Sequence, residues 1–158
     1  MESPAPDAVE FTSVDYPHLT VWFPATWEAA EDEEGTLEIF RPSDDTGTFR
    51  LSMMQIQRKG EPVADPANVY LRAQAQDDSY ETVSDDPLII AQPVKQLEED
   101  GIAFLHHTWL TGQGLNLLIC TYSEPLSYTD TDQAEQDYAL VQLILRNIEY
   151  KPAANQAA

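Results

Sequence analysis

The residues that could do chemistry in this chain are three histidines, one cysteine and many acids. His106 and His107 are adjacent in a segment with the pattern of a strand, so their side chains should leave opposite faces of a sheet and cannot bind one metal ion together. A three-ligand site would need His18, one of this pair and a carboxylate to meet. We therefore expect ordinary sheet histidines, no metal site and no cofactor.

The single cysteine, Cys120, lies in an apolar run over residues 117–122. A thiol in such a run usually behaves as a small buried hydrophobic group, whereas a reactive cysteine needs a nearby cation or a helix start. One cysteine also allows neither an intramolecular disulfide nor a cage of thiolates around a metal. We expect Cys120 to belong to the core.

The remaining motifs do not indicate an enzyme. Residues 111–114 (TGQG) lack the lysine of a phosphate-binding loop and join two predicted strands, so they read as a turn. The acid pairs at residues 44–45, 77–78 and 85–86 fall in loops or at a polar helix end, where solvated charge is expected rather than acid–base catalysis. We expect no catalytic activity and no catalytic residue.

The chain carries 28 acidic residues against 8 lysines and arginines, a formal net charge of −20. Nucleic-acid binding requires clustered Lys and Arg, and anionic membranes attract the same groups, so this charge excludes the first class and disfavours the second. The acids are spread along the whole chain. Such a surface fits high solubility or a salt-rich host, and a cation-binding surface remains the alternative.

Hydrophobic periodicity predicts one α+β domain over residues 10–150, between flexible tails at 1–9 and 151–158. The predicted order is β-β-β-α-β-β-β-α, allowing one strand either way, in an antiparallel sheet of about six strands flanked by helices. A first helix from Asp65 to about residue 82 would have a thin apolar face of Val69, Ala73, Tyr80 and Val83, so we expect it to lie partly exposed over the sheet. Predicted strands cover 19–23, 36–41, 48–57, 88–91, 94–98, 102–110 and 115–122, and an amphipathic helix covers 134–148.

The start of the chain has neither a basic segment nor an apolar run. The sequence therefore predicts no signal peptide, no membrane insertion and a cytoplasmic location.

Residues 19–27 (LTVWFPATW) resemble the opening of the PsbP-like superfamily, with a hydrophobic strand, a proline, two short residues and a tryptophan. That superfamily includes PsbP, the Mog-type proteins that bind the GTPase Ran, bacterial DcrB-like proteins and chaperones of type VI secretion effectors. The resemblance implies that this chain is a bacterial member of the superfamily. It also implies an antiparallel sheet between helices and a role in binding other proteins.

We therefore expect a non-enzymatic binding or accessory module whose partner is another protein. The alternative is a small-ligand or cation-binding protein with a pocket between the terminal helix and the sheet. The candidate ligand or partner surface consists of Trp109, His107 and Tyr122, from the two strands that precede the terminal helix.

Overall fold

The computed structural model describes residues 9–42, 46–56, 64–77 and 79–151. Except for Val9 and Lys151, the two predicted tails lie outside these residues, as do Asp44, Asp45 and Asp78.

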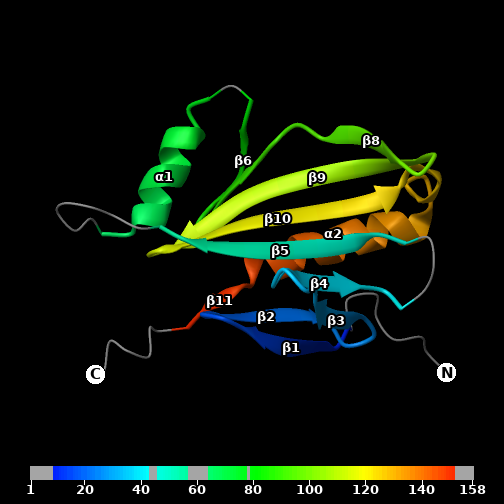
Figure 1. Cartoon of the computed structure of the whole chain (residues 1–158), viewed down its shortest axis with the longest axis horizontal. Helices are drawn as coiled ribbons and strands as arrows, with labels where there is room; N and C mark the ends of the chain where they lie inside the picture. Colours follow the sequence, from blue (N-terminus) through cyan, green and yellow to red (C-terminus); the bar gives the residue numbers. More distant parts are fainter. Residues whose placement is uncertain (1–8, 43–45, 57–63, 78, 152–158) are drawn as a thin grey trace.

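The described residues form one large antiparallel sheet of eight strands (Figure 1). Seven of them follow the order β3-β4-β5-β10-β9-β7-β6. The eighth, β8, pairs with the first part of β9, at Ile102–His106. The strands are β3 (Glu28–Glu31), β4 (Leu37–Phe40), β5 (Thr48–Gln55), β6 (Glu81–Asp85), β7 (Leu88–Ala91), β8 (Lys95–Glu99), β9 (Ile102–Gln113) and β10 (Asn116–Pro125).

A second, three-stranded sheet has the order β1-β2-β11, with β1 (Phe11–Tyr16), β2 (Leu19–Pro24) and β11 (Glu149–Tyr150). In β2 the side chains alternate, and Leu19, Val21 and Phe23 are buried while Trp22 stays exposed. Period-two alternation places one set of side chains in the core and the other on the surface. The small sheet therefore presents one apolar face inward.

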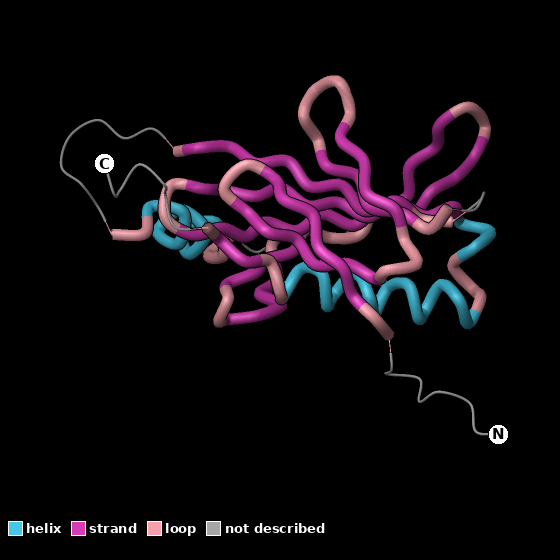
Figure 2. Tube along the Cα trace, turned by 90° about the horizontal axis from the view of Figure 1, so that it is seen from below, coloured by secondary structure: helices cyan, strands magenta, loops and turns pink. Residues whose placement is uncertain are grey.

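Helix α2 (Asp132–Arg146) and the small sheet cover the same face of the large sheet. The helix begins after Thr131, whose hydroxyl accepts a hydrogen bond from the Ala134 amide at 3.0 Å. It follows the short 3-10 helix η1 (Leu126–Tyr128) and runs along the strands in Figure 2. One core cluster joins Val141, Ile144 and Leu145 of α2 with side chains of both sheets, among them Val21, Phe49, Leu51, Leu118 and Cys120.

Helix α1 (Pro66–Gln74) packs on the opposite face of the large sheet, at one end only (Figure 1). The side chain of Asp65 caps it by accepting a hydrogen bond from the Asn68 amide at 3.2 Å. Leu71 is fully buried there with apolar residues of β7, β9 and β10, namely Leu88, Ile90, Leu110 and Leu117.

The structure corrects the predicted first helix. It ends at Gln74, and residues 81–85 form strand β6 instead. The buried side chains are Pro66, Ala67 and Leu71, whereas Val69 is 52% exposed. Ala67 and Leu71 are four residues apart and so share a helical face, which is the face that meets the sheet.

The α+β class, the mainly antiparallel sheet and the hairpin of β4 with β5 are confirmed, but the count of about six strands is wrong. Four strands were not predicted: β1, β3, β6 and β11. β7 and β8 are not paired with each other, because both pair with β9. β7 pairs with β9 at Trp109–Thr111, and β8 pairs with β9 at Ile102–His106. Short polar strands such as β3 and β6 carry too few apolar residues to reveal themselves by periodicity.

Within the described residues, neither helix combines the length and the apolar character needed to cross a membrane.

Replacing Leu71 with alanine tests the observed packing of α1. Leu71→Ala should lower the free energy of unfolding by about 2–5 kcal/mol, because it empties a fully buried site. The control Val69→Ala, on the exposed face of the same helix, should change it by less than about 0.5 kcal/mol. Urea denaturation measures both, and equal losses would contradict this packing.

Candidate functional site

The three residues of the predicted surface lie together beneath α2, where Tyr138 of the helix joins them. His107 and Trp109 are two residues apart on β9, so their side chains share one face of the sheet. Tyr122 lies opposite His107 on β10. The ring of His107 stacks on Trp109 with centroids 5.6 Å apart, and it lies 6.1 Å from Tyr122 and 5.0 Å from Tyr138. We call these four residues the aromatic cluster.

Burial divides the aromatic cluster into core and edge. Trp109 and Tyr122 are 2% and 1% exposed, so they serve the core and cannot meet a ligand without a rearrangement. His107 is half-buried and Tyr138 is 37% exposed. Burial, and then the neighbouring His106, lower the pKa of His107, so its ring is neutral at pH 7. Contact of this cluster with a ligand or partner remains a prediction, and His107 and Tyr138 are the members placed to make it.

A buried carboxylate stands next to the aromatic cluster. Asp137 of α2 is 1% exposed and pairs with Arg41, which follows β4, at 2.7 Å. It also accepts hydrogen bonds from the Tyr128 hydroxyl at 2.6 Å and from the Gln133 amide at 3.1 Å. The Arg41 guanidinium lies 5.6 Å from the ring centre of Trp27. We call this set the Asp137 network, and it ties α2 to the end of β4 in the large sheet.

A second buried acid, Glu124 of β10, lies nearby and is 5% exposed. Its Oε2 atom and the Tyr122 hydroxyl have no hydrogen-bond partner among the described residues. Burial raises the pKa of the Glu124 carboxyl; the adjacent Tyr122 hydroxyl lowers it in part, and the charge of Asp137 raises it further. Glu124 is therefore the acid of this region whose environment most resembles that of a ligand-binding or titrating group.

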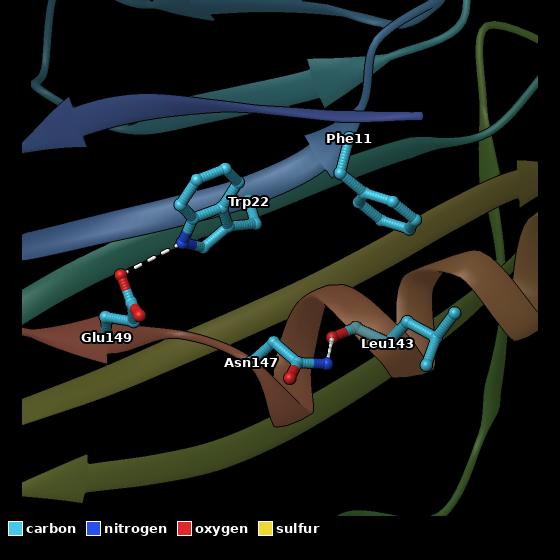
Figure 3. Close-up of a pocket in the computed structure, with 5 residues that line it drawn as sticks. All are labelled: Phe11, Trp22, Leu143, Asn147 and Glu149. Atoms are coloured by element: carbon cyan, nitrogen blue, oxygen red, sulfur yellow. Dashed lines mark hydrogen bonds between the residues drawn. The ribbon is translucent and has the colours of Figure 1, made fainter. Parts of the chain in front are cut away.

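The other flank of α2 borders an open groove of about 340 Å³, shown in Figure 3. It is lined by Phe11 of β1, Trp22 of β2, Glu149 of β11, and Leu143 and Asn147 at the end of α2. The Trp22 indole donates a hydrogen bond to Glu149 at 3.0 Å, and the Asn147 side chain donates one to the Leu143 carbonyl at 2.8 Å. We call this set the Trp22 groove.

Trp22 is unusual because its large ring faces water. It is 38% exposed, whereas the other two tryptophans, Trp27 and Trp109, are 5% and 2% exposed. Leu143 is 45% exposed on the facing helix. Large apolar side chains that meet in an exposed concave site mark a place where a partner can bind.

The sequence contains a signal for this groove, although Trp22 matches no known motif. The alternation of residues 19–23 already placed Trp22 on the polar side of its strand, and an aromatic ring there is a candidate contact residue. Asp137 had a similar signal, since it lies in the apolar stripe of α2 between Ala134 and Val141. No comparable pattern marks Glu124.

The remaining candidates lie apart from these sites. His106 is on the opposite face of the sheet from His107, as predicted, and bonds to Ser123. His18 lies in the turn between β1 and β2, near the Gln55 side chain. Cys120 is fully buried, which confirms its predicted place in the core. In the described ranges, no three His, Cys, Asp or Glu side chains cluster as metal ligands.

Glu124→Gln tests the buried acid through the pH dependence of stability. In the wild-type protein the unfolded chain loses the Glu124 proton at a lower pH than the folded chain does. The unfolded state therefore binds fewer protons between the two pKa values, and stability falls as pH rises through that window. Glu124→Gln removes this loss, so the variant should gain stability relative to wild type at pH 7 but not at pH 4.

Urea denaturation at both pH values measures the effect, with Glu135→Gln on the exposed side of α2 as the control. A difference between Glu124→Gln and wild type that is the same at pH 4 and pH 7 would count against a raised pKa.

Comparison with solved structures shows a shared fold. A crystal structure from Bacteroides thetaiotaomicron VPI-5482 aligns over 86% of this chain and 46% of its own, with 19% identity and a TM-score of 0.61. This chain therefore spans less than half the length of that protein. At 19% identity the likeness concerns the fold alone.

The solution structure of cyanobacterial PsbP (CyanoP) from Synechocystis sp. PCC 6803 aligns over 95% of this chain and 98% of its own, with 9% identity and a TM-score of 0.36. Such a score does not assign a fold, so membership of the PsbP-like superfamily stays a prediction.

No curated protein matches the chain in sequence. The family described as "Domain of unknown function (DUF3805)" matches residues 11–155, which include every helix and strand of both sheets. The chain therefore belongs to the DUF3805 family.

Proposed function

We propose that this domain is a non-enzymatic binding module that holds a segment of another protein in the Trp22 groove. The observation that carries the proposal is the exposure of Trp22 and Leu143 on opposite walls of one concave, mainly apolar site. A tryptophan in such a site is the residue type most often found to dominate the binding energy of a protein interface.

The open form of the groove favours a protein segment over a small molecule. Sites for small molecules enclose about 70–90% of their ligand. Here the walls are formed by Trp22 and Leu143, whose side chains are themselves 38% and 45% exposed, so a small ligand would remain largely in water. A protein segment instead places one apolar side chain in the groove and covers the surrounding surface with its flanks.

Charge specifies the flanks of the partner. The chain has a net charge of −20, and Glu149 lies in the groove beside Trp22. Arg146, one turn after Leu143 on α2, is a local exception to this negative surface. Farther from Arg146, the net negative charge of the protein attracts a basic partner and repels an acidic one. The occupant is therefore an apolar side chain between basic residues.

Affinity capture from the native host, with matched variants, tests this proposal. Wild type and the control Val69→Glu, whose substitution lies on exposed α1, should retain the same partner. Leu143→Glu and Trp22→Ser should lose it, because removal of a central anchor typically costs about 2 kcal/mol or more, roughly a thirtyfold loss of affinity. Titration with the basic segment of that partner should change Trp22 fluorescence.

Two results would contradict the proposal. One is a partner that Leu143→Glu and Val69→Glu retain equally well. The other is a concentration-dependent dimer, detected by sedimentation, that Leu143→Glu abolishes, since the groove would then hold a second copy of this chain.

A second candidate function is a small-ligand or cation site between α2 and the sheet. The buried Oε2 atom of Glu124, which has no hydrogen-bond partner among the described residues, favours it. A ligand at 100 times its dissociation constant should add about 2.7 kcal/mol to the stability of the folded protein. Thermal unfolding against divalent cations and small cationic metabolites measures this effect, and Glu124→Gln should remove it. An equal shift in the Glu124→Gln variant would place the ligand elsewhere.

A further inference from the structure

The face of the large sheet that is turned away from α2 carries a separate set of polar groups. Helix α1 packs on this face but covers only the end that carries Leu110 and Leu117. Farther along the strands, one cross-strand row runs from Thr48 on β5 through Ser123 on β10 and His106 on β9 to Lys95 on β8. Directly opposed residues of neighbouring strands share a face, so these four side chains project together.

The next row adds Arg50 of β5, opposite Thr121 of β10, which is opposite Thr108 of β9. We call Lys95, His106, Ser123 and Arg50 the cationic patch. The positive charges of Arg50 and Lys95 both reach His106, and after burial they are the causes that lower its pKa. Three nitrogen-bearing side chains thus converge in a protein of net charge −20.

Acids balance this patch only in part, through one ion pair to Arg50. Within the described residues Lys95 forms no ion pair, although its own strand holds Glu98 and Glu99. Glu98 points to the opposite face of the sheet from Lys95, and Glu99 lies about 13 Å from Lys95 along the strand. Glu38 on β4 is the one acid that contacts the patch, through Nε of Arg50 at 2.8 Å. The terminal amino groups of Arg50 have no hydrogen-bond partner in the described part of the chain.

His106 has one ring nitrogen engaged and one available. Its Nδ1 atom lies 2.6 Å from the Ser123 hydroxyl. A catalytic serine–histidine pair needs a third group that orients the histidine, and no described side chain bonds to Nε2. When protonated, Nε2 can donate a hydrogen bond to an anion, beside the Lys95 ammonium and the Arg50 guanidinium. Such charge-assisted bonds are the usual means of holding phosphate.

Apolar side chains continue the patch along β8 and β9. Leu97 lies opposite Phe104, and Glu99 opposite Ile102, on the same face as Lys95 and His106. Leu97 is 46% exposed and Ile102 is 52% exposed. An anion at the cationic patch would therefore have an apolar surface beside it.

We propose that the cationic patch binds the phosphate group of a phosphate monoester whose organic part is apolar and rests on Leu97 and Phe104. The site lies on the sheet face opposite the Trp22 groove, so this binding is independent of the protein partner proposed above.

The adjacent histidines allow a direct test by NMR. The pKa of His106 and the pKa of His107 are measured in chloride, inorganic phosphate and phenyl phosphate at equal ionic strength. Phenyl phosphate should raise the pKa of His106 by about one unit, because a bound anion favours the charged ring. The pKa of His107, on the opposite face, should not change and serves as the internal control.

Two matched variants assign the charge. Lys95→Gln should weaken the binding of phenyl phosphate at least fivefold. Arg146→Gln makes the same change of charge on α2 and should leave the affinity for phenyl phosphate unchanged. Leu97→Ser should remove the preference for phenyl phosphate over inorganic phosphate. The unchanged pKa of His107 would show that each variant is folded.

An equal His106 pKa in chloride and phenyl phosphate would overturn the proposal. Equal weakening by Lys95→Gln and Arg146→Gln would do the same, because it would show a nonspecific effect of total charge.

Discussion

The whole structure depends on covering one apolar face of the eight-stranded sheet. Phe49, Leu51, Leu118, Cys120 and Tyr122 project from that face, and removing them from water is the dominant gain on folding. The amphipathic helix α2 covers part of the face, and the inward side of β2 covers the rest. Two different elements thus share one buried surface.

This division of the covering layer creates the main surface feature. Where α2 and the small sheet meet, their outward side chains form the walls of the Trp22 groove (Figure 3). On the other side of the large sheet, α1 covers one end only, and it approaches the sheet closely at Gly112. A Cβ atom on Gly112 would clash with the carbonyl oxygen of Asn116 and would lie 3.1 Å from the Cβ of Ala67, so glycine fits between the neighbouring strand and the helix where a larger residue would not. The rest of that face keeps its polar rows.

Buried polar groups then fix how α2 sits in this layer. Asp137 would be costly inside the apolar stripe of the helix without partners, and Arg41, Tyr128 and Gln133 supply them. The pairing joins the end of β4 to η1 and α2, and Arg41 lies 96 residues before Asp137 in the chain. A buried pair of this kind adds little net stability but penalises arrangements that separate its members.

The sequence alone determined the α+β class, the hairpin of β4 with β5, the terminal helix, the buried Cys120 and the opposed directions of His106 and His107. All of these follow from local periodicity and turn residues, which act over a few positions. Only the tertiary structure decided that α1 ends at Gln74, that β7 and β8 share β9, and that Trp22 and Leu143 line one groove. These features depend on contacts between distant segments, which no local pattern of residues specifies.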